Sequence, residues 1–113
     1  MRHNPLNKRL LELLRSRIIK ETDIVRHQHG AAIIAYSGSV LSIGVNRRGS
    51  GYSSRFSLHA EEVAIARAAR RGIPPHSYLV VARLQSGGWA NSKPCDRCSV
   101  LIKESGIKTV WHT

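Results

Sequence analysis

Two short clusters of residues constrain the fold of this chain more than any other feature. One is His59-Ala60-Glu61-Glu62, and the other, well downstream, is Pro94-Cys95-Asp96-Arg97-Cys98. One neutral imidazole and two thiolates make three zinc ligands, and they leave the fourth tetrahedral position for a water molecule. This is the arrangement of a catalytic rather than a structural zinc site. The fold therefore has to bring His59, Cys95 and Cys98 to a single ion.

The spacing of the two cysteines suits a chelate on a helix, because residues i and i+3 lie on one face, one turn apart. Pro94 suits the start of a helix, where an amide hydrogen would find no helical partner. The positive end of the helix dipole should lower the pKa of both thiols and favour the thiolates that zinc requires. His59 and Glu61 are a harder case, since side chains two residues apart in a regular helix point roughly 200° apart.

The order H-x-E and then P-C-x-x-C is the signature of zinc-dependent nucleobase deaminases. From roughly Gly30 to the C-terminus, the chain resembles the cytidine and deoxycytidylate deaminase superfamily, which also includes tRNA adenosine deaminases. The stretch from Pro94 to Val110, with Leu101-Ile102 and Ser105-Gly106-Ile107-Lys108, is most similar to the deoxycytidylate branch.

This resemblance implies one zinc ion per chain and a hydrolytic reaction on cytosine in a nucleoside or nucleotide. A zinc-bound hydroxide would attack the carbon that carries the amino group, ammonia would leave, and cytosine would become uracil. The resemblance also implies that His59 and Glu61 both lie at the very start of their helix. There Glu61 is not a ligand but a proton shuttle to the ring nitrogen and the departing amine. We interpret Glu62 as a charge that complements the helix dipole.

Two candidates for substrate binding also come from the resemblance. It implies that Asn46, at the end of a strand, binds the sugar or base, and that the backbone amide of Ala60 bonds the base carbonyl. The simpler interpretation of Asn46 is a turn residue followed by two arginines.

Other candidates come from their positions beside the two clusters. Phe56 and Trp89 lie in the loops before the clusters, where an aromatic ring could stack on a base or only anchor its loop. Basic residues flank the same clusters and could recognise phosphate or belong to a generally basic surface. They are Arg47, Arg48, Arg55, Lys93 and Arg97. The remaining histidines, including His29, are interpreted as surface or structural residues.

Three alternatives stay open at this point. The first is an enzyme that edits polynucleotides, either cytosine in single-stranded DNA or RNA or adenosine in tRNA, which the basic charge favours. The second is a non-catalytic zinc or nucleic-acid-binding module, against which the presence of Glu61 argues. The third is a redox pair of Cys95 and Cys98, which the upstream His59 makes less attractive.

Composition favours a single small domain with anionic partners. The chain of 113 residues has 18 Lys and Arg against 7 Asp and Glu, a formal charge of +11. Such a surface concentrates nucleotides or polynucleotides near it. Two cysteines within one cluster give no disulfide framework, and no apolar run approaches a membrane span. We expect one deaminase domain over residues 1–113 of a soluble, cytoplasmic protein, assembled as a homo-oligomer whose neighbours help to enclose the pocket.

Apolar periodicity predicts the elements of an α/β fold. We expect a covering helix over about residues 5–21, capped by Asn4 before Pro5, and a catalytic core over about 29–113. The core should begin with a hairpin of strands 29–36 and 40–45, followed by an irregular loop over 46–57. A helix over 59–71, a strand over 78–84, a loop over 85–93, a helix over 95–105 and a strand over 108–112 should follow. Together they predict a three-layer α/β/α sandwich of the cytidine deaminase type with a mixed sheet of about four strands.

Overall fold

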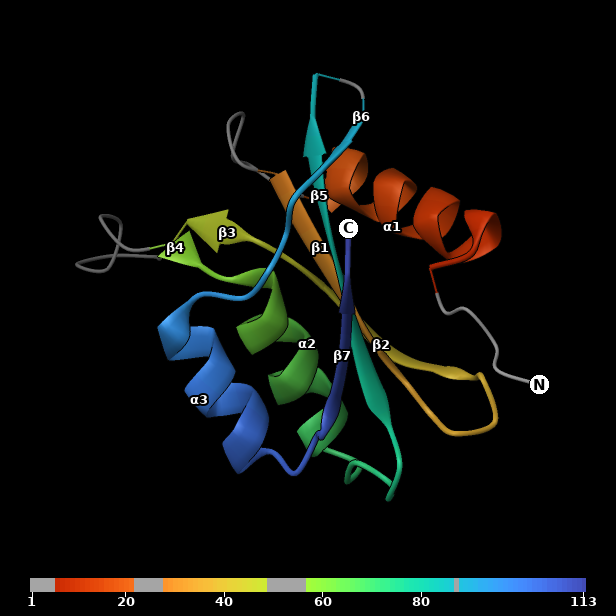
Figure 1. Ribbon diagram of the computed structural model, residues 1–113, viewed down its shortest axis with the longest axis vertical. Helices are drawn as coiled ribbons and strands as arrows, with labels where there is room; N and C mark the ends of the chain where they lie inside the picture. Colours follow the sequence, from red (N-terminus) through yellow and green to blue (C-terminus); the bar gives the residue numbers. More distant parts are fainter. Residues whose placement is uncertain (1–5, 22–27, 49–56, 87) are drawn as a thin grey trace.

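The computed structural model describes residues 6–21, 28–48, 57–86 and 88–113. It has three layers, with α1 on one face of a central sheet and α2 and α3 on the other (Figure 1). The three-layer prediction is therefore confirmed. The elements in order are α1 Lys8–Glu21, β1 Gln28–Ile34, β2 Val40–Val45, β3 Arg47–Arg48, β4 Ser57–Leu58, α2 Ala60–Ala69, β5 Tyr78–Gln85, β6 Gly88–Ala90, α3 Asp96–Glu104 and β7 Thr109–His112.

The main sheet has five strands, one more than expected. Its order is β2-β1-β5-β6, and β7 also pairs with β5. All pairings are antiparallel except that of β5 with β7, so the sheet is mixed as predicted. The additional strand, β6, lies in the segment expected to be a loop. Its three residues, Gly-Trp-Ala, are too few to show an alternating pattern, and pairing with the end of β5 makes them a strand.

The core divides between the two faces of β1 and β5, because alternate side chains point to opposite sides of a strand. Ala31, Ile33, Leu79 and Val81 pack against α2 and α3. The residues between them, among them Ala32 and Val80, pack against α1. Both faces of these strands are buried, which explains their nearly continuous apolar sequence.

α1 covers one face of the sheet with Leu10, Leu14 and Ile18, as its apolar stripe predicts. It begins later than expected. The side chain of Asn7 accepts a hydrogen bond from the amide of Leu10 at 2.9 Å, so Asn7 provides a cap for the helix that starts at Lys8. Asn4 and Pro5, the cap expected from the sequence, lie outside the described residues. Within the described residues, every helix is too short or too polar to traverse a bilayer.

α2 lies unusually close to β2 because both elements have small residues where they meet. A Cβ atom added to Gly44 of β2 would lie 2.5 Å from the amide nitrogen of Ala64 and 2.6 Å from the carbonyl oxygen of Ala60. Only glycine permits this approach of two backbones. The contact fixes the height of α2 over the sheet, and with it the position of the first cluster at its N-terminus.

Candidate active site

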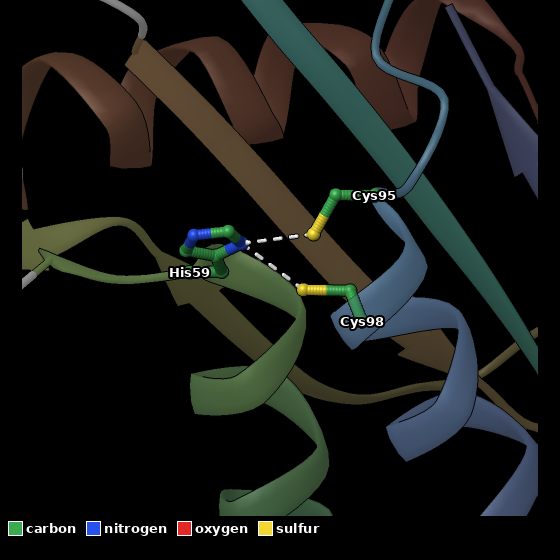
Figure 2. A group of neighbouring side chains, drawn as sticks. All are labelled: His59, Cys95 and Cys98. Atoms are coloured by element: carbon green, nitrogen blue, oxygen red, sulfur yellow. Dashed lines mark hydrogen bonds between the residues drawn. The ribbon is translucent and has the colours of Figure 1, made fainter.

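The N-terminal ends of α2 and α3 meet, and each presents one of the two clusters. His59 is the N-cap of α2, and Cys95 is the N-cap of α3. Figure 2 shows the side chains of His59, Cys95 and Cys98 pointing toward one another from these two helix ends. The Nδ1 atom of His59 lies 3.1 Å from the Sγ atom of Cys98 and 3.7 Å from that of Cys95. The expected convergence of the three side chains is present.

These three atoms fit a single zinc ion. They lie within 4.8 Å of one another. Zinc bonds of about 2.3 Å to sulfur and 2.0–2.1 Å to nitrogen place tetrahedral ligand atoms roughly 3.5–3.8 Å apart, close to this spacing. One nitrogen and two sulfurs leave one position of a tetrahedron for a further ligand. Cys98 is fully buried and Cys95 is exposed, so the site is closed toward the core and open on one side.

The pKa of the Cys98 thiol is shifted in the direction opposite to the one expected from the sequence. Burial raises the pKa of Cys98 well above its ordinary value, and the neighbouring Glu61 charge raises it further. The predicted lowering of the pKa by the helix dipole was wrong for Cys98, because desolvation at this fully buried position outweighs it. The thiol therefore keeps its proton at neutral pH until a metal ion replaces it.

Glu61 is a buried carboxylate beside the metal ligands. It is the second residue of α2, two positions after the N-cap His59, and only 5% of its surface is exposed. Because His59 precedes the first helical turn, the two side chains are not held apart by helical geometry. Both reach the same cavity, which resolves the geometric problem posed by their spacing.

Glu62 joins the starts of the two helices. Its Oε1 atom accepts a hydrogen bond from the amide of His59 at 3.1 Å and one from the Nη2 atom of Arg97 at 2.5 Å. The first bond caps α2, in agreement with the interpretation of Glu62 as a helix N-terminal charge. The second bond is an ion pair with α3, so Arg97 neutralises this carboxylate.

A cavity of about 360 Å³ is lined by two of the candidate metal ligands, His59 and Cys95, and by Glu61. Its lining includes Asn46, Ala60 and Lys93 from the sequence-based candidates, together with His29 and Ser92. Asn46 is buried, and its side-chain oxygen accepts a hydrogen bond from the amide of His29 at 2.9 Å. The structure therefore brings Asn46 and Ala60 to the cavity that also contains the catalytic candidate.

His29 and Ser92 are cavity residues that the sequence analysis did not select. A signal for His29 was present, because the alternation of β1 places it on the same face as Ala31 and Ile33, toward α2. Ser92 gave no such signal, since it lies in an irregular segment.

Hydrogen bonds to Thr113 hold the segment that leads into the second cluster. The amide of Ser92 donates to the carbonyl oxygen of Thr113 at 3.0 Å, and the Ser92 hydroxyl donates to the carbonyl of Val81 at 2.8 Å. The Thr113 hydroxyl donates to the carbonyl of Ala90 at 2.6 Å. Thr113, which directly follows β7, thus anchors the wall of the cavity to the main sheet.

Residues 7–113 match the family model described as the cytidine and deoxycytidylate deaminase zinc-binding region. The chain belongs to the cytidine and deoxycytidylate deaminase family. The match includes both clusters, and zinc is the cofactor that this deaminase family binds at such a region. A comparison with curated protein sequences gives no match.

Solved structures of deaminases share the fold. The dCMP deaminase of cyanophage S-TIM5 is 25% identical, with a TM-score of 0.66 over 95% of this chain and 84% of that one. The cytidine deaminase of Burkholderia pseudomallei is 22% identical, with a TM-score of 0.68 over 97% of this chain and 81% of that one. The cytidine deaminase of Mycobacterium tuberculosis is 21% identical, with a TM-score of 0.61 over 91% of this chain and 83% of that one. The last two similarities are evidence of the fold alone.

Several residues named as candidates from the sequence are not among those that line this cavity. Trp89 is 36% exposed and lines a separate depression together with residues of α1, among them Leu11 and Arg15. Its role in stacking on a base is therefore not supported by its position. Arg47 is exposed on β3 and is not among the cavity-lining residues. Phe56, Arg55 and the side chain of Arg48 lie outside the described residues, so their roles stay predictions.

Proposed function

We propose that this chain is a zinc-dependent hydrolase that converts cytosine to uracil in a nucleoside or nucleotide, with dCMP as the leading candidate substrate. The observation that carries the proposal is the position of Glu61. A purely structural zinc site gains nothing from a buried carboxylate at its open side, whereas a hydrolytic site needs a proton carrier there. The 25% identity to a dCMP deaminase and the resemblance to that branch favour dCMP.

His59, Cys95 and Cys98 would hold the zinc ion. When bound, zinc supplies a water molecule of lowered pKa and acts as a Lewis acid. Glu61 accepts a proton from the attacking water and donates it to the ring nitrogen. It then takes the remaining proton of the added hydroxyl group and donates it to the amino group, which leaves as ammonia. One water is consumed and one ammonia released. The burial of Glu61 limits exchange of these protons with bulk solvent.

Asn46 and Ala60 are the proposed contacts to the substrate. The first four amides of a helix have no partner within it, so the amide of Ala60 at the start of α2 can donate to the base carbonyl. The Asn46 oxygen accepts from His29, which orients the amide group at the cavity wall. Together they would fix the base with its amino group toward the metal ligands.

Glu61→Gln tests this function, because the amide keeps the size of the carboxylate and cannot carry the proton. We expect deamination of dCMP and cytidine, followed by ammonia release and conversion to uracil, to fall by roughly 10²–10⁴-fold. Zinc content should stay at one ion per chain. Undiminished turnover in this variant would show that the proton carrier is another group. Failure of the wild-type protein to deaminate any cytosine substrate would favour the non-catalytic alternative.

We also propose a homo-oligomer. Within the described residues, β7 pairs only with β5, so its outer edge can accept a strand or be covered by another subunit. A monomeric mass in light scattering, measured at the concentration used for assays, would contradict this part of the proposal.

A further inference from the structure

A second cavity, of about 690 Å³, is lined by residues of α3, of β7 and of the segment between them, and it shares Lys93 with the first cavity. Figure 1 shows where α3 and β7 lie in the fold. We refer to this second cavity as the α3–β7 groove. Aliphatic side chains, including Ile102, Ile107 and Val110, form part of its lining. Among the described residues that line it there is no carboxylate. Its lining includes four exposed basic side chains: Lys93, Lys103, Lys108 and His112.

The lysines of the groove take part in no ion pair with another described residue. In the described part of the chain, the ion pairs join Glu21 to Arg17 and Arg67, and Glu62 to Arg97. None of them includes a lysine of the groove. The formal charge of +11 on the whole chain adds to the local field. A groove of this kind concentrates a flexible polyanion more effectively than a neutral ligand.

Lys93 connects the groove to the catalytic cavity, because it lines both. In the proposed function, the catalytic cavity holds the base of a cytosine nucleotide. A ligand that continues from this nucleotide past Lys93 would enter the groove. A free mononucleotide would leave the groove unused, whereas a nucleotide within a strand would occupy both spaces.

We propose that the α3–β7 groove binds single-stranded DNA adjacent to a target cytosine in the catalytic cavity. The lysines would pair with phosphates, and the aliphatic floor would contact sugars and base faces. A single strand is required because a base within a duplex cannot reach a buried reaction centre. The identity of the base and the choice of DNA rest on the proposed function, in which dCMP is the leading substrate.

Binding is tested first with fluorescein-labelled oligothymidylate, which contains no cytosine and therefore does not depend on deamination. The groove variant is Lys103→Glu/Lys108→Glu. The matched control is Arg70→Glu/Arg71→Glu, which reverses two exposed charges at the C-terminal end of α2. We expect fluorescence anisotropy to show at least a roughly tenfold loss of affinity in the groove variant only. The plot of log affinity against log salt should become less steep by about 1.4, or 0.7 for each lost phosphate contact.

Turnover is tested with a single cytosine in an oligothymidylate, compared with free dCMP. The kcat/KM for the oligonucleotide divided by the kcat/KM for dCMP should fall in the groove variant. In the control this ratio should stay at the wild-type value. Equal loss of oligothymidylate binding in both variants would overturn the proposal, since it would indicate a general effect of surface charge. Tighter groove-dependent binding of oligouridylate, or of polyglutamate, would overturn it in favour of RNA or an acidic protein segment. Groove-dependent DNA binding without any deamination would support the groove and reject the proposed function.

Discussion

At the scale of single residues, we expect the buried thiol of Cys98 to make zinc uptake depend on pH. Its raised pKa keeps it protonated through the neutral range, so binding of zinc must release this proton. Each released proton makes log affinity rise by about one for every pH unit. We expect the apparent zinc affinity, measured by competition with a chromophoric chelator, to rise at least tenfold between pH 7 and pH 8. A constant affinity over this interval would mean that Cys98 is not a ligand or is already ionised.

A second prediction at the scale of single residues concerns the hydroxyl group of Thr113. Thr113→Val removes the hydroxyl that donates to Ala90 and accepts from the amide of Arg83 at 3.2 Å, and leaves these backbone groups without that partner. The free energy of unfolding should fall by about 1–3 kcal/mol. Thr113→Ser keeps the hydroxyl and serves as the control. Urea unfolding curves that coincide for the wild type and the Val variant would show that these bonds do not stabilise the fold.

At the scale of elements, the close contact between α2 and β2 places the first cluster. Gly44→Ala would force a methyl group against two backbone atoms of α2, and overpacking of this kind costs about 1–3 kcal/mol or more. Because His59 and Glu61 begin this helix, zinc affinity should fall together with the melting temperature.

Gly88→Ala is the matched control for this substitution, since the nearest atom to its added Cβ is 3.9 Å away. Both variants are measured by thermal unfolding and zinc titration. If the melting temperature and zinc affinity of Gly44→Ala equalled those of Gly88→Ala, the close backbone contact at Gly44 would not determine the position of α2.

The long elements were predictable because each has its own periodic pattern of apolar residues. The Leu stripe of α1 and the apolar runs of β1 and β5 led to the correct layers. The short strands β3, β4 and β6 were not predicted, because strands of two or three residues form through pairing and carry no pattern of their own. The region expected to be an irregular loop between residues 46 and 57 begins and ends with the paired strands β3 and β4.

At the scale of the whole molecule, the site exists because the topology brings the starts of α2 and α3 together on one face of the sheet. The metal ligands could be named from sequence, since their residue types and spacing are restrictive. The rest of the cavity could not, because it depends on which segments become neighbours. His29 reaches it from β1, and Ser92 reaches it through hydrogen bonds that end at Thr113. Trp89 was named as a candidate because it is close in sequence to the second cluster, but in the structure it lines a different depression.

The proposed activity depends on His59, Cys95 and Cys98 binding one zinc ion next to Glu61. X-ray absorption at the zinc edge, on protein purified without added metal, tests it most directly. We expect two sulfur neighbours at about 2.3 Å and two nitrogen or oxygen neighbours at about 2.0–2.1 Å around each ion. Zinc surrounded by four sulfur atoms or by none, or protein purified without zinc, would contradict it.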